Sequence, residues 1–196
     1  MAYQLSDLFW TTSPGESQFS LSQEHKDENA ARIMGIFLKL GWQFESICAM
    51  LGNMDVESRM NPRAQNQGAD TYGLVQWHPA SKYTNWATAE GLDYELGTSQ
   101  CRRIAYEEEN NLQWQDWAVV TFSEWARTLQ EPIETLTYYF MRYYEVADTG
   151  TQNERIEWAL YYFQNVTPIY QFPIWIFVPV LAARKRKQLG RRKISL

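Results

Sequence analysis

The sequence has 196 residues, a length typical of one compact domain with tails. It holds 18 Lys and Arg against 23 Asp and Glu, and seven of the basic residues lie in residues 169–196, where there is no acid. The rest of the chain therefore carries 11 basic against 23 acidic side chains. Such an acidic domain is not expected to bind nucleic acid, and the basic end suggests a partner of its own.

Cysteine and histidine are too sparse to build a metal or triad site. Cys48 and Cys101 have no metal-ligand spacing, and two buried free thiols are favoured over a single disulfide. His25 and His78 are equally isolated, so we expect no metal, no cofactor and no Ser-His triad. The nine Trp, twelve Tyr and nine Phe fit either a well-filled core or a carbohydrate cleft, because flat rings with polar tips suit sugar faces.

Residues 1–27 are polar, contain Pro14-Gly15, and are predicted to form an N-terminal arm. A first helix is predicted from about Asp27 to Leu40, with Gly41 as its stop. The N-terminus lacks the basic start and apolar core of a signal peptide. Synthesis and retention in a cytoplasm are therefore expected.

A second helix opens at Gln43 and carries the most informative residue of the chain. Its apolar side chains recur at helical spacing, at Ile47, Met50, Leu51 and Met54. Glu57 lies three residues further, on the edge of that face, and the helix must end before Asn61-Pro62. Burial and the negative end of the helix dipole are both expected to raise the pKa of Glu57, as a general acid requires. An ordinary surface carboxylate is the alternative.

The segment from Tyr72 to Trp77 follows a polar loop, residues 66–71, and reads Tyr-Gly-Leu-Val-Gln-Trp. It is short, apolar and β-prone, which predicts a strand or turn beside the end of the second helix. Gly73 permits backbone to approach a ligand closely.

Five further helices are predicted after this segment. They span about residues 81–91, 98–109, a short stretch after Thr121, 132–144 and 153–164. Thr121 and Glu124 have the spacing of a capping box, and Glu107 to Glu109 are expected to face solvent. The predicted fold class is α+β, mostly α, with a small β element beside the second helix.

Composition changes abruptly near Pro168, so residues 167–196 are predicted to be an apolar and then basic C-terminal anchoring tail. The apolar part is interrupted by Pro173 and Pro179 and is too short for a membrane span of about 20 residues. The expected partner is a protein that buries the apolar run and pairs with the basic cluster. An anionic membrane surface is the less favoured alternative.

Several spaced elements of residues 28–166 together resemble the phage tail lysozyme family, the muramidase domain of tail-tip proteins of short-tailed phages. These elements are residues 47–54, Glu57-Ser58, Asn61-Pro62, residues 73–77, Tyr144-Glu145 and Arg155. The resemblance implies a lysozyme-like fold, with Glu57 as the catalytic acid. One departure is Val146-Ala147 after the Tyr-Glu pair, where the family tends to have Arg-Pro. The relatives often carry a metallopeptidase domain after the muramidase, and no such domain is expected here.

Glycoside hydrolysis needs a proton donor and normally a second carboxylate. Glu57 is the predicted donor, and Asp70 and Glu145 are the candidates for the second group. The side chains and backbone predicted to contact substrate are Tyr72, Gly73, Leu74, Val75, Gln76, Trp77 and Tyr144. For Leu74 and Trp77, a role in closing the core is an equal alternative.

The resemblance implies a peptidoglycan-degrading glycosidase, located in the virion at the phage tail or tail tip, that locally opens the cell wall during genome entry. The protein would be made in the host cytoplasm, and its C-terminal tail would bind a viral tail or capsid protein. A lytic transglycosylase with the same glutamate is one alternative. A structural tail component without catalytic activity is the other.

Overall fold

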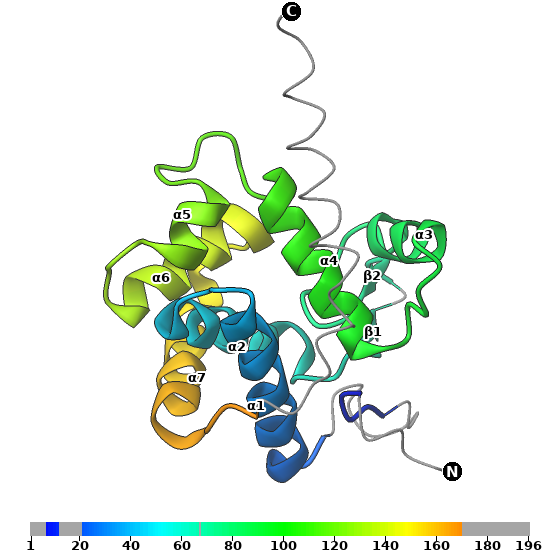
Figure 1. Cartoon of the computed structure of the whole chain (residues 1–196), viewed down its shortest axis with the longest axis horizontal. Coiled ribbons are helices and arrows are strands. Elements are labelled where there is room, and N and C mark those ends of the chain that lie inside the picture. The colour runs from blue at the N-terminus through cyan, green and yellow to red at the C-terminus, as the bar shows by residue number, and fades with distance from the viewer. Residues whose placement is uncertain (1–6, 12–20, 67, 170–196) are drawn as a thin grey trace, which may run out of the picture.

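The computed structural model describes residues 7–11, 21–66 and 68–169 (Figure 1). The elements are α1 (Gln23–Lys39), α2 (Phe44–Ser58), β1 (Gln65–Asn66), β2 (Thr71–Tyr72), α3 (Ser81–Ala89), α4 (Gly97–Asn110), α5 (Phe122–Arg127), α6 (Ile133–Phe140), the π-helix η1 (Met141–Glu145), the 3₁₀-helix η2 (Thr149–Thr151) and α7 (Gln152–Asn165). The prediction of a mostly helical α+β fold is confirmed. The predicted tail lies, apart from its first three residues, outside the described residues.

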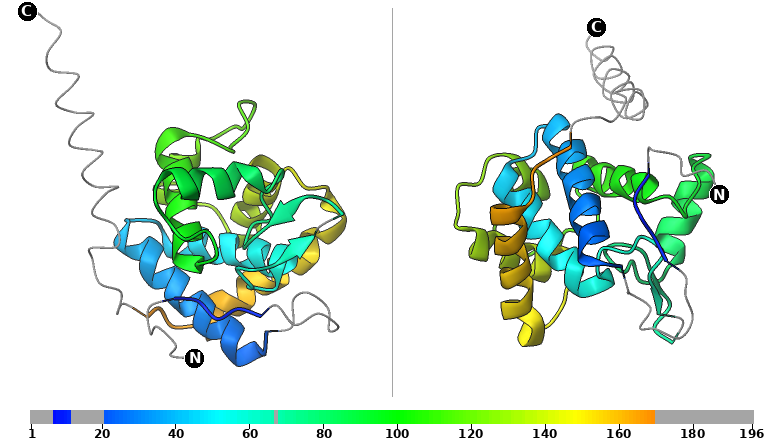
Figure 2. Two further views of the ribbon diagram at one scale, coloured as in Figure 1. Left: turned by 90° about the vertical axis from the view of Figure 1, so that its right-hand side faces the viewer. Right: turned by 90° about the horizontal axis from the view of Figure 1, so that it is seen from below.

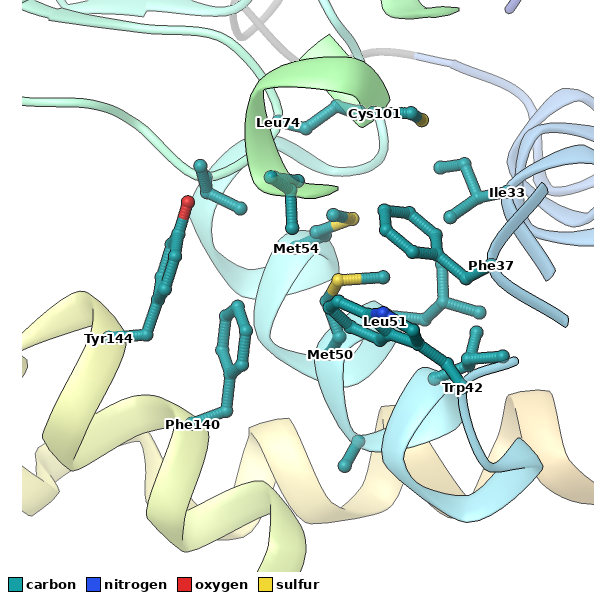
Figure 3. Close-up of a cluster of buried hydrophobic side chains, with 14 of the residues drawn as sticks. Ile33, Phe37, Trp42, Met50, Leu51, Met54, Leu74, Cys101, Phe140 and Tyr144 are labelled. Atoms are coloured by element: carbon teal, nitrogen blue, oxygen red, sulfur yellow. The ribbon is translucent and has the colours of Figure 1, made fainter. Parts of the chain in front are cut away.

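Helix α2 is the centre of the fold and contacts α1, α5, α6 and α7 (Figure 1). The apolar face predicted from Ile47, Met50, Leu51 and Met54 is fully buried. These side chains meet residues of α1, α4 and α6 in one cluster, shown in Figure 3. Burial extends further round the helix than the apolar face alone would require, since Asn53 and Asp55 are buried too.

Helix α7 crosses α2 at Gly52, where the two backbones nearly touch. A Cβ atom at this position would lie 2.3 Å from the carbonyl oxygen of Arg155 and 2.8 Å from the Cβ of Ala159. Only glycine allows helices to come this close. The contact places the first turns of α7 against the last two turns of α2.

Two small groups of elements lie on either side of α4. Figure 1 shows β1, β2 and α3 on one side and α5 and α6 on the other. The two strands are antiparallel, with Gln65 opposite Tyr72, and Tyr72 also forms a bridge with Trp77. The predicted β element therefore exists. Its two strands lie at the two ends of the predicted loop, and residues 73–76 of the predicted strand or turn form a turn.

Most predicted helix ends are confirmed, because they depend on local signals. Gly41 has a φ of +82° after α1, and Gln43 is the N-cap of α2. Thr121 and Glu124 form the expected capping box of α5. Helix α1 begins at Gln23, four residues earlier than predicted, since the hydroxyl of Ser22 accepts a hydrogen bond from the backbone N–H of His25.

Residues 7–11 of the predicted arm run alongside α1, as Figure 2 shows. The Asn29 side chain binds both backbone groups of Phe9, at 2.7 Å to its nitrogen and 2.9 Å to its oxygen. Leu8 is buried against Gly97, and the Asn61 side chain bonds the backbone of Thr11. This short segment is therefore attached to α1, to α4 and to the residues that follow α2.

The expected continuous helix from Pro132 to Tyr144 changes character at Met141. Residues Met141–Glu145 form a π-helix, a local widening that is often found at functional sites. It ends at Val146 with a φ of +57°. A β-branched residue is strained in this left-handed conformation.

Relief of that strain should be measurable. Val146→Gly is expected to stabilise the protein by about 1 kcal/mol, because the αL cost of a Cβ exceeds the extra unfolded-state freedom of glycine. Urea denaturation is the measurement. Ala147→Gly is the matched control and should instead destabilise, by roughly 0.5–1 kcal/mol. Equal shifts for both variants would contradict the strain at Val146.

Cys48 and Cys101 are buried free thiols, as predicted. No helix within the described ranges combines the length and the apolar composition needed to cross a membrane.

Candidate active site

Glu57 lies on the last turn of α2, where the sequence predicted it. The helix ends because Arg59 adopts the left-handed conformation, with a φ of +51°, and its backbone N–H bonds the carbonyl oxygen of Asp55. The Glu57 side chain is 21% exposed. It can therefore meet a ligand while most of its surface is covered by protein.

An ion pair with Arg155 of α7 orients the Glu57 carboxylate. Arg155 Nη2 lies 2.5 Å from Glu57 Oε1, and the arginine side chain is only 3% exposed. Its other donors bond Asn53 Oδ1 at 2.9 Å and Thr151 Oγ1 at 3.0 Å. A guanidinium held at three points is fixed in place, so one oxygen of Glu57 is fixed and Oε2 stays available.

Asn53 joins this arrangement from one turn earlier on α2. Its side-chain N–H groups donate to the carbonyl oxygens of Ala49 and Thr137, which leaves its oxygen for Arg155. The close approach at Gly52 is what brings Arg155 within reach of both Asn53 and Glu57. Sequence reasoning included Arg155 in the family resemblance but gave it no role in the site.

Glu145 is one of the two candidates for the second carboxylate. It is the last residue of the π-helix, and its Oε1 is buried with no hydrogen-bond partner among the described residues. Burial raises the pKa of Glu145 well above its ordinary value, and the charges of Glu57 and Glu107 raise it further, while Arg155 opposes them. The structure therefore brings together two predicted residues, Glu57 and Glu145, in different electrostatic environments.

Asp70, the other candidate for a second carboxylate, lies in the exposed turn between β1 and β2. Asp70 lines an open hollow of about 480 Å³. Residues of both strands, residues of α3 and Tyr94 line it too. The described contacts do not join Asp70 to the Glu57–Arg155 pair. Of the two candidates, Glu145 is the one that interacts with the charge of Glu57.

The predicted substrate-contacting segment turns most of its side chains inward. Tyr72, Leu74, Val75 and Trp77 are between 0% and 4% exposed. Gly73 is buried with a φ of +86°, and a Cβ there would lie 2.6 Å from the Gln100 side-chain oxygen. Leu74 and Trp77 are therefore buried in the core, which was the alternative to a role in substrate contact. Contact between this segment and a substrate stays a prediction, and it would have to involve mainly backbone.

Gln76 is half-buried and its amide is already engaged. Its oxygen accepts from the Thr71 hydroxyl at 2.5 Å, and its nitrogen donates to the carbonyl oxygens of Gly73 and Ala64. These bonds hold the turn closed on the hairpin. A direct bond from Gln76 to a sugar would have to replace one of them.

The expectation that Glu107 to Glu109 face solvent is wrong for two of the three. Glu107 is 0% exposed and Glu108 is 4% exposed. Glu108 pairs with Arg127 of α5 at 2.7 Å, and Glu107 accepts hydrogen bonds from three side chains. One of these is the hydroxyl of Tyr144, which is buried and which the sequence placed among the substrate contacts. A run of acidic residues is normally predicted to be exposed. The burial of these two carboxylates could not be predicted, because Trp77, Tyr144 and Arg127, which donate hydrogen bonds to them, are far away in the sequence.

Comparison with known proteins agrees with the fold. Residues 28–166 match the phage tail lysozyme family. The chain is also similar to Morphogenesis protein 1 of Bacillus phage B103, with 38% identity over 152 residues. The match covers 75% of this chain and 41% of that protein, so the chain spans less than half the length of this relative.

Proposed function

Because the chain belongs to the phage tail lysozyme family, we propose that it is a glycoside hydrolase of the muramidase type. Its substrate is peptidoglycan, and the bond cleaved joins N-acetylmuramic acid to N-acetylglucosamine. The observation that carries the proposal is a pair of interacting carboxyl groups: Glu57 at the end of α2, oriented by Arg155, and half-buried Glu145 at the end of the π-helix, whose Oε1 is buried and which is acted on by the charge of Glu57.

Glycosidic bond cleavage needs a proton on the leaving oxygen and a carboxylate for the oxocarbenium-like centre or for water. Two carboxyl groups in different environments can divide these tasks. In our assignment Glu57 donates the proton through Oε2, the oxygen that Arg155 leaves available. Glu145 is the second carboxyl.

The reverse assignment, with Glu145 as donor, is supported by the raised pKa of Glu145. Substrates with an activated leaving group separate the two assignments, because such a group departs without protonation. The variant that lacks the donor should recover most of its rate on an aryl glycoside of a chito-oligosaccharide. The variant that lacks the second carboxyl should not.

Glu145→Gln should lower the rate of glycan cleavage by roughly 10²–10⁴-fold. Asp70→Asn, the matched control in the hairpin, should retain a rate close to that of the parent. Turbidity of cell-wall suspensions and release of reducing ends measure both. A loss of activity in Asp70→Asn but not in Glu145→Gln would make Asp70 the second carboxylate.

The same variant should change how stability depends on pH. The pKa of Glu145 is raised in the folded protein, so its contribution to stability is complete below the unfolded-state value and is lost as pH rises through the folded-state value. Glu145→Gln cannot ionise, so this loss should be absent in the variant. Urea denaturation across the pH range tests the difference.

The product of the reaction decides between hydrolysis and transglycosylation. A lytic transglycosylase uses one glutamate and leaves 1,6-anhydro ends, whereas a hydrolase leaves reducing ends. Glu145 beside Glu57 favours hydrolysis, since a hydrolase uses a second carboxylate. Mass spectrometry of digested peptidoglycan is the test. Anhydro ends would overturn the assignment as a hydrolase, and intact glycan would favour the structural role.

We also propose that the chain acts as a virion component and opens the wall locally during genome entry. The similarity to a phage morphogenesis protein supports this role. Viral tail or capsid proteins are the proposed partners of the C-terminal residues, and export would be by assembly into the particle. Proteomic analysis of purified particles tests the location. Particles without the chain would contradict it.

A further inference from the structure

Glu107 of α4 is a buried carboxylate that the proposed chemistry does not use. Its two oxygens accept hydrogen bonds from Arg103 Nε at 2.7 Å, from Trp77 Nε1 at 3.2 Å and from the hydroxyl of Tyr144. The side chain is 0% exposed. A buried carboxylate with this many donors is held in a single orientation.

The three side chains that donate hydrogen bonds to Glu107 come from three different elements around the site. Trp77 ends the segment that returns from the β hairpin and bridges back to Tyr72. Tyr144 immediately precedes Glu145 in the π-helix. Arg103 lies one turn before Glu107 on α4. Glu107 thus joins one element from each side of α4, and one of them carries the second carboxyl.

We propose that Glu107 is a positioning residue of the candidate site. Through Tyr144 it fixes the π-helix that presents Glu145, and through Trp77 it fixes the turn that contains Gly73 and Gln76. Its removal would leave three donors without this acceptor, two of them on the buried side chains of Trp77 and Tyr144, which makes the position sensitive to change. This inference rests on the proposed function only for its effect on catalysis.

The charge of Glu107 gives the proposal a second consequence. The charged groups that act on Glu145 are Glu57 from α2, Arg155 from α7 and Glu107 from α4. Burial raises the pKa of Glu107, whereas the charge of Arg103 and the hydrogen bonds from Tyr144, Arg103 and Trp77 oppose that rise and favour the carboxylate. Since the negative charge of Glu107 disfavours ionisation of Glu145, its removal should move the titration of Glu145 to lower pH.

Glu107→Gln tests this consequence because it removes the charge and keeps the length of the side chain. Glu108→Gln is the matched control: the adjacent residue on the same helix is also buried and also ion-paired, but with Arg127 on another side. Carboxyl ¹³C NMR, with the Glu145 signal identified by its loss in Glu145→Gln, follows the titration. The midpoint should fall in Glu107→Gln and stay unchanged in Glu108→Gln.

Glu107→Asp tests the positioning itself. It keeps the charge but shortens the reach to Tyr144 and Trp77, so kcat on peptidoglycan should fall roughly tenfold or more with little change in KM. The midpoint of Glu145 should stay closer to that of the parent than in Glu107→Gln. This variant also keeps the proposal testable if Glu107→Gln does not fold.

The result that overturns the proposal is an unchanged Glu145 midpoint in Glu107→Gln, or an unchanged kcat in Glu107→Asp. Equal effects of Glu108→Gln would also overturn it, since they would indicate a general loss of helix packing. A parent protein that releases no reducing ends would refute the proposed function alone. The NMR titration would still decide whether Glu107 acts on Glu145.

Discussion

Glu57→Gln should lower the rate of peptidoglycan cleavage by roughly 10²–10⁴-fold, among the largest changes in activity that we expect for a single substitution. The amide cannot donate a proton to a leaving oxygen, yet it keeps an oxygen that can accept from Arg155 Nη2. The loss of charge beside a buried arginine should lower stability without preventing folding. Reducing-end release gives the rate, and thermal unfolding followed by circular dichroism gives the stability.

Glu154→Gln is the matched control for that experiment. Glu154 precedes Arg155 on α7 and forms its own ion pair with Arg59 at 2.7 Å, but it is 40% exposed and lies outside the site. Its loss should change neither rate nor stability by much, as is usual for exposed ion pairs. If Glu57→Gln clears cell walls as fast as this control, Glu57 is not the proton donor.

Gly52→Ala should cause the largest loss of stability, roughly 3 kcal/mol or about 10 °C in Tm. The added Cβ would lie 2.3 Å from the Arg155 carbonyl oxygen and 2.7 Å from the Ala159 nitrogen. Both are backbone atoms, so no side-chain rotation can remove the clash, and α7 must move away from α2. Differential scanning calorimetry measures the effect.

The same shift should lower activity in the protein that remains folded, because Arg155 would move away from Glu57 and Asn53. Gly68→Ala is the control, since a Cβ there would meet only the Asn66 side chain at 3.5 Å, an ordinary contact. If Gly52→Ala were as stable as Gly68→Ala, the close backbone contact between α2 and α7 at Gly52 would be contradicted.

Elements whose causes are local could be predicted from the sequence alone. The apolar spacing of α2, its end before Asn61-Pro62 and the capping box at Thr121 and Glu124 all depend on residues within a few positions of each other. The position of Glu57 follows from the same helix. These features could be predicted because helix periodicity, capping and the restriction before proline act within one or two turns.

The surroundings of the site depend on contacts between residues that are far apart in the sequence. Arg155 lies 98 residues from Glu57, and Tyr144 lies 37 residues from Glu107. No local pattern reveals such pairs, so the buried role of Glu107 and the inward side chains of Leu74 and Trp77 could not be assigned from sequence. The π-helix at Met141–Glu145 is similar, because the pattern of its residues equally fits a regular helix. Burial and the charges of Glu57, Arg155 and Glu107 set the pKa of Glu145, and they act together only when α2, α4 and α7 are packed around it.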